Sequence, residues 1–183
     1  MATKRDVQYI LGYVGGGLLV LGLIPLGLWR ASRALDQRIG RQLIPVAGLR
    51  LMIAGVLSVL GLLFGVWSIV VQNKVGKGGP LEFAGIEVSP KTQNLVVTGP
   101  YKYCRNPMLF GACAFYYGVA VYLNSVIATA LVTLFTTFML IFVKLSEEPR
   151  LLKDFGSDYE EYRRRVSMFV PGMQKRRPNC LDS

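Results

Sequence analysis

The sequence predicts an all-α integral membrane protein with about four transmembrane helices. Of its 183 residues, 52% are hydrophobic and only 17% are charged, against about 25% charged residues in a typical soluble domain. The charges are also unevenly placed, because residues 7–29, 51–73 and 106–143 contain none. A helix needs about 20 apolar residues to cross the hydrocarbon layer. The first two charge-free segments therefore predict one span each, and the third predicts two.

The third segment is 38 residues long and has a turn signal near its middle. Leu123, Asn124 and Ser125 stand there, and Asn and Ser favour turns and helix N-caps. We therefore expect a hairpin of two helices, over residues 108–122 and 125–144. The first of these is short for a span, so we expect it to begin within the interfacial region of the bilayer.

The first segment also has features of a cleaved signal peptide, because Lys4 and Arg5 precede it. It is longer than the apolar part of such a peptide, contains Pro25 and has no clear small-residue cleavage site. A retained span is the better interpretation. The chain then divides into two N-terminal helices joined by an arginine-rich loop (1–73) and a C-terminal region (74–183). The latter comprises a loop (74–107), the hairpin (108–144) and a tail (145–183).

The positive-inside rule predicts the orientation. Residues 74–105 and 144–177 carry fourteen Lys and Arg residues, and the hairpin places both stretches on one side, which we expect to be cytoplasmic. Four spans then put both termini in the cytoplasm. The loop over residues 30–50 would lie outside although it carries five arginines. An amphipathic segment at the interface, over residues 31–43, would reconcile this loop with the rule.

Composition excludes several classes of function. The chain has no histidine, so it lacks the commonest metal ligand and the commonest general base. Its three cysteines (Cys104, Cys113 and Cys180) have neither metal-site nor disulfide spacing. We therefore expect no metal. The net charge of +10 fits membrane topology and anionic lipid headgroups better than nucleic-acid binding.

Two polar stretches flank the predicted hairpin and carry the candidate catalytic residues. Arg105 and Asn106 precede Pro107, which suits the first turn of a helix. A helix N-terminus attracts anions, and an arginine there adds a bidentate carboxylate clamp. After the hairpin come Glu147 and Glu148, which we expect in the first turn of a helix capped by Ser146. This pattern predicts a site for a ligand with an anionic end and a hydroxyl-bearing end.

Ordered short motifs in the C-terminal hundred residues resemble the isoprenylcysteine carboxyl methyltransferase family and its phospholipid methyltransferase relatives. Before the hairpin they are the Gly/Pro loop at 76–80, the stretch 94–103 and Arg105-Asn106-Pro107-Met108. After the hairpin they are Glu147-Glu148, Leu152, Phe155-Gly156, Tyr159, Tyr162 and Val170-Pro171. Each motif alone is weak, and the set with a hairpin between them is specific.

The resemblance implies a membrane-embedded methyltransferase that uses S-adenosylmethionine. Residues implied to bind this cofactor are Gln93, Asn94, Leu95, Val96, Tyr101, Asn106, Pro107, Met108, Leu109 and Glu147. Arg105 and Glu148 are the implied catalytic residues. Many relatives have histidine at the position of Asn106 and an aromatic residue at that of Leu109. Asparagine can still hydrogen-bond the cofactor but cannot shuttle a proton.

The methyl acceptor would be lipophilic: an isoprenylcysteine-like carboxylate, or a lipid amine or thiol. Its head would meet the cytoplasmic site while its tail stays in the bilayer, with Lys144 and Arg150 as candidate charge partners. Two alternatives stay open. An NADPH-dependent lipid or sterol reductase shares similar C-terminal motifs but needs more spans. A non-catalytic membrane scaffold of the same fold is the other, and the asparagine at position 106 favours it.

Overall fold

A computed structural model describes residues 15, 17–39, 42–76, 82–83, 86–87 and 93–172. The π-helical turn η1 (Leu19–Leu23) leads into α2 (Ile24–Ile39), and α3 (Ala47–Val71) ends in the π-helical turn η2 (Gln72–Gly76). A 3-10 turn, η3 (Gly99–Lys102), precedes α4 (Pro107–Tyr122) and α5 (Val126–Phe142). A last π-helical turn, η4 (Val143–Glu147), joins α5 to α6 (Glu148–Arg165). The predicted helical class is confirmed. The prediction omitted one short antiparallel pairing, between β1 (Glu82–Phe83) and β2 (Ile86–Glu87).

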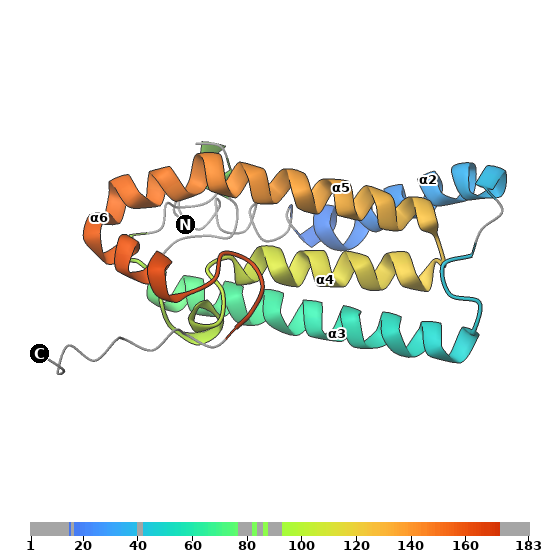
Figure 1. Cartoon of the computed structure of the whole chain (residues 1–183), viewed down its shortest axis with the longest axis horizontal. Helices are drawn as coiled ribbons and strands as arrows, with labels where there is room; N and C mark the ends of the chain where they lie inside the picture. Colours follow the sequence, from blue (N-terminus) through green and yellow to red (C-terminus); the bar gives the residue numbers. More distant parts are fainter. Residues whose placement is uncertain are drawn as a thin grey trace, which may run out of the picture.

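The predicted hairpin is present, and its turn lies where Asn and Ser indicated. Helices α4 and α5 run antiparallel and are joined at Leu123, Asn124 and Ser125 (Figure 1). Asn124 has a φ of 55°, in the left-handed region that Asn tolerates. The Ser125 hydroxyl caps α5 by accepting a hydrogen bond from the Ala128 amide at 2.8 Å.

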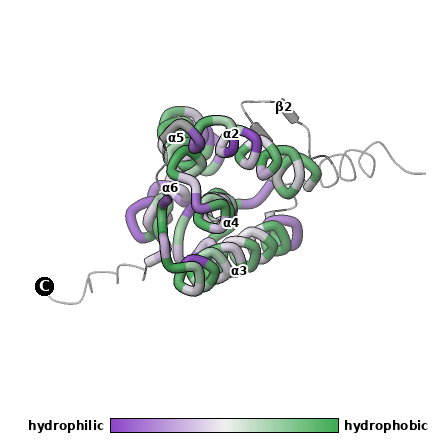
Figure 2. The backbone as a smooth tube through the Cα atoms, turned by 90° about the vertical axis from the view of Figure 1, so that its right-hand side faces the viewer, coloured by the Kyte–Doolittle hydropathy of each residue, from purple (hydrophilic) through white to green (hydrophobic). Residues whose placement is uncertain are grey.

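Helix α4 is the central helix of the bundle, between α3 and α5 (Figures 1 and 2). It packs on α3 through residues without bulky side chains. A methyl group added at Gly111 would lie 2.6 Å from the Gly65 amide nitrogen and 2.7 Å from the Gly61 carbonyl oxygen. The two backbones are thus in near contact, as in small-residue interfaces of membrane helices. Helix α3 is therefore an integral part of the bundle that the hairpin forms.

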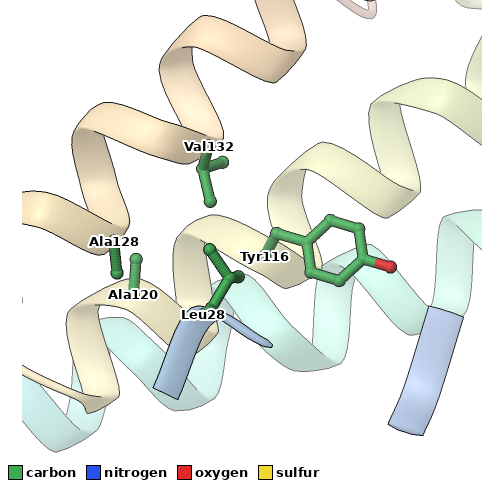
Figure 3. Packing of buried hydrophobic residues seen from close by; sticks show 5 residues of the cluster. All are labelled: Leu28, Tyr116, Ala120, Ala128 and Val132. Carbon is green, nitrogen blue, oxygen red and sulfur yellow. The ribbon is translucent and has the colours of Figure 1, made fainter. Parts of the chain in front are cut away.

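On its other side, α4 packs against α2 and α5. Leu28 of α2 inserts between the two helices of the hairpin, beside Tyr116 and Val132 (Figure 3). Ala120 and Ala128 are fully buried in the same cluster and let α4 and α5 approach each other. This cluster fixes the hairpin geometry on which the position of the polar ends depends.

The arginine-rich segment continues the first helix, because α2 runs without a break from Ile24 through Trp29 to Ile39. Its charges have local partners. The Arg33 guanidinium lies 4.7 Å from the centre of the Trp29 ring. Asp36 accepts a hydrogen bond from the Ile127 amide at 3.2 Å, so this part of α2 is fastened to the start of α5. It lies at the end of the bundle opposite α6 (Figure 1).

Two continuous helical stretches are long and apolar enough to cross a membrane, Ala47–Gly76 and Val126–Arg165. Their outward side chains are large and apolar, among them Leu63, Val66, Leu134 and Phe138. Both stretches therefore have the length and the outward surface of membrane-spanning helices. Helix α4 has 16 residues, which is about 24 Å and short of a full crossing. Residues 7–14 of the first predicted span lie outside the described residues, so the four-span topology stays a prediction.

The prediction that Ser146 caps a new helix is wrong. Helix α5 passes through η4 directly into α6, and the N-cap of α6 is Glu147, which makes no side-chain capping bond. A π-helical turn adds one residue to a helix without breaking it, which accommodates Pro149 near the start of α6. Helix α6 is kinked at Gly156, which has φ 54° and ψ −128°.

Candidate functional site

The two polar stretches flanking the hairpin meet at one end of the bundle (Figure 1). Nη1 of Arg105, just before α4, lies 2.5 Å from Oε1 of Glu148, at the start of α6. Their side chains are only 9% and 11% exposed. A buried ion pair of this kind persists only where further hydrogen bonds support it.

Two residues from the second half of α6 complete the cluster. The same Nη1 of Arg105 donates a hydrogen bond to the Tyr159 hydroxyl at 3.2 Å. Nη1 of Arg163 lies 4.0 Å from the other oxygen of Glu148. The Nε atom of Arg105 is buried and has no hydrogen-bond partner in the part of the chain that the structure describes. An unsatisfied buried N–H is costly, so a further partner at this nitrogen would be favourable.

The segment after α6 fastens the loop that carries Arg105. The Arg105 amide donates to the Ser167 carbonyl at 2.9 Å, next to a parallel bridge between Cys104 and Ser167. The backbone amide and the Nδ2 atom of Asn106 both donate to the Met168 carbonyl, at 3.2 and 3.0 Å. The side chain of Asn106 thus holds the C-terminal segment through its N–H₂ group.

Tyr101 ties the loop to both α3 and α6. Its hydroxyl donates to Oε1 of Gln72 at 2.5 Å, and the Tyr162 hydroxyl donates to the Tyr101 carbonyl at 2.7 Å. Burial raises the pKa of the Tyr101 phenol well above its usual value, with smaller contributions from Cys104 and from the negative charge of Glu147. The phenol is therefore protonated at neutral pH, and Glu147 is near enough to influence its pKa.

Upstream residues of the loop pair with the end of α3. The amides of Gln93 and Asn94 both donate to the Gly76 carbonyl, at 2.8 and 3.3 Å. The side chain of Asn94 donates to the Val75 carbonyl at 3.0 Å. Leu95 packs on the cluster formed by Tyr159, Tyr162 and Val166, which places it beside the ion pair.

The other predicted site residues differ in accessibility. Val96 and Pro107 are buried. Met108, Leu109 and Glu147 are partly exposed in the helical turns that border the ion pair, and so is Arg150. Lys144 is exposed on η4. Residues 77–80 of the predicted Gly/Pro loop lie outside the described residues.

Tyr159, Arg163 and Met168 are not among the site residues that the sequence predicted. The spacing of Tyr159, Tyr162 and Val166 was a usable signal, because positions i, i+3 and i+7 share one face of a helix. The role of Met168 is carried by its carbonyl, which no side-chain pattern reveals.

Comparison with known proteins adds a family match. The sequence model of one family, phospholipid methyltransferase, matches residues 49–158. The matched part is more than half of the chain and contains most of α3, the hairpin, Arg105 and Glu148. No curated protein sequence and no solved structure matches the chain.

Proposed function

Because the chain belongs to the phospholipid methyltransferase family, whose members are membrane methyltransferases, we propose that it transfers a methyl group from S-adenosylmethionine to a lipophilic acceptor. The acceptor is an isoprenylcysteine-like carboxylate, or a lipid amine or thiol. The observation that carries this proposal is the buried pair of Arg105 and Glu148, 2.5 Å apart at the end of a membrane-embedded hairpin.

The charges of the site fit this cofactor. S-adenosylmethionine has a carboxylate, an ammonium group and a sulfonium, so it needs one cationic and several anionic or dipolar partners. Arg105 offers a buried Nε donor without a partner among the described residues, and Glu147 and Glu148 offer carboxylates. The other residues that would hold the cofactor are Gln93, Asn94, Leu95, Val96, Tyr101, Asn106, Pro107, Met108 and Leu109.

The bound cofactor would supply an electrophilic methyl group, and the protein would hold that group in line with the acceptor. Displacement at a sulfonium is in-line, so holding donor and acceptor in register accounts for most of the acceleration. A carboxylate or thiolate acceptor needs no base. An amine acceptor must lose a proton, and Glu147 or Glu148 would take it. The absence of histidine is therefore compatible with the reaction.

The same proposal places the site at the cytoplasmic face, with four spans and both termini on that side. The acceptor would enter from the bilayer between helices, with its head at the ion pair and its tail in lipid. Lys144 and Arg150 would then face the acceptor's charge. The region from residue 74 onward is the catalytic part in this scheme, with α3 as its structural support.

Ligand-induced stabilisation tests the cofactor. Detergent-purified protein is heated with S-adenosylmethionine, its demethylated product or NADPH. A ligand at 100 times its dissociation constant adds about 2.7 kcal/mol to the free energy of unfolding. We expect a higher Tm with the first two ligands. A higher Tm with NADPH alone would support the reductase alternative and refute the proposal.

Methyl transfer tests the reaction and the role of Arg105. Labelled S-adenosylmethionine is incubated with the protein and a lipid extract, and label in the lipid fraction is counted. Arg105→Ala should reduce incorporation at least a hundredfold, because it removes the guanidinium proposed to bind the cofactor and leaves the buried Glu148 with Arg163 alone, 4.0 Å away. Arg164→Ala is the matched control, since that exposed arginine also lies in an ion pair, with Glu160. No incorporation by the unaltered protein would favour the scaffold alternative.

A further inference from the structure

We propose that Tyr159 is a positioning residue, whose hydroxyl fixes the Arg105 guanidinium so that its remaining N–H donors face the ligand. This role rests on the proposed function, because it needs a ligand at Arg105. Tyr159 is only 1% exposed, and its hydroxyl accepts a hydrogen bond from Nη1 of Arg105.

The kink in α6 is what brings Tyr159 to the ion pair. Glu148 and Tyr159 are eleven residues apart, which in a straight helix is about 16 Å along the axis. Both nevertheless contact the same nitrogen of Arg105, at 2.5 and 3.2 Å. Gly156 makes this possible, because its φ of 54° turns the second half of the helix back toward the loop. A methyl group there would meet no atom within 4 Å, so the glycine serves the backbone conformation.

Two contacts on one nitrogen, an ion pair with Glu148 and a hydrogen bond to Tyr159, determine how the guanidinium is oriented. Arginine has five N–H donors in a rigid plane, and Glu148 and Tyr159 engage Nη1. Nε stays buried and without a partner in the described part of the chain. With the carboxylate alone, the guanidinium can rotate into a two-point pair with Glu148, the geometry that arginine and carboxylate prefer. The hydroxyl of Tyr159 opposes that rotation and keeps the other donors directed away from the glutamate.

A single hydroxyl deletion tests this role. Initial rates of labelled-methyl transfer into a lipid extract are measured against S-adenosylmethionine concentration, at a temperature where circular dichroism shows every variant folded. We expect Tyr159→Phe to lower kcat/KM about tenfold, the effect of one hydrogen bond to a charged group. Tyr117→Phe is the control, because its hydroxyl also makes one side-chain hydrogen bond, to Thr133 at 3.0 Å, remote from the site. It should stay within twofold of the unaltered protein.

A double-mutant comparison separates positioning from simple support of the fold. If Tyr159 acts through Arg105, then Tyr159→Phe should lower kcat/KM by less than twofold in an Arg105→Lys background. A further tenfold loss in that background would overturn the role, and so would a single Tyr159→Phe variant with unchanged kcat/KM. If the unaltered protein neither transfers methyl groups nor binds the demethylated cofactor, the proposed function fails and this role fails with it.

Discussion

The close contact between α3 and α4 makes Gly111→Ala a stringent test of the packing. The added methyl carbon would lie 2.6 Å from the Gly65 nitrogen and 2.7 Å from the Gly61 oxygen. Carbon needs about 3.5 Å from such atoms, so the helices must separate by nearly 1 Å. Overpacking of this kind costs about 1–3 kcal/mol, while alanine returns up to about 1 kcal/mol of helix propensity. We expect a net loss of about 1–2 kcal/mol.

Gly55→Ala is the matched control, because Gly55 lies on α3 with no atom within 4 Å of the added methyl group. It should gain up to about 1 kcal/mol from helix propensity. The two variants should thus differ by about 2–3 kcal/mol. The difference is measurable by unfolding in mixed micelles with increasing dodecyl sulfate, followed by the fluorescence of Trp29 and Trp67. Equal stability of the two variants would refute the interface.

Three further predictions concern the turn, the loop and pH. Asn124→Ala should lower stability by about 2 kcal/mol, because it loses a bond from the Ile44 amide and places alanine at a φ of 55°; Asn124→Gly, which keeps the backbone conformation, should lose less in the same micelle assay. Tyr101→Phe should lower Tm by removing the 2.5 Å bond to Gln72, at about 1 kcal/mol, and an unchanged Tm would contradict that bond. Burial raises the pKa of the Cys104 thiol from 9.0 to about 11. The contribution of the buried neutral thiol to stability is therefore complete below pH 9 and is lost as pH rises toward 11. Tm should fall less over this interval in Cys104→Ala than in the unaltered protein, and an identical pH dependence would contradict the shift.

The sequence predicted the hairpin and the meeting of its polar ends because both follow from local chemistry. A charge-free segment of that length has to form two helices, and Asn124 and Ser125 are typical turn and cap residues. Two helices joined by a tight turn bring the residues before and after them to one end. The proximity of Arg105 and Glu148 follows from this geometry.

The features that the sequence did not predict depend on a local insertion in a helix or on backbone contacts between distant segments. Ser146 has the residue type of a cap, but one extra residue in a π-helical turn is enough to continue the helix, and that insertion has no sequence signature. The bridge between Cys104 and Ser167 uses backbone atoms alone. The small residues of the α3 interface were readable, since Gly61 and Gly65 have the spacing of a membrane-helix contact.

The absence of a break between α5 and α6 has a mechanical consequence. Glu148 lies at the far end of a continuous helix that begins at Val126, 22 residues away, or about 33 Å along the axis. A change of about 10° in helix tilt, as occurs when bilayer thickness changes, would move the glutamate by about 6 Å if the helix tilted alone. The pair with Arg105 survives only if the hairpin tilts as one body. We therefore expect activity in reconstituted vesicles to vary with the acyl-chain length of the host lipid.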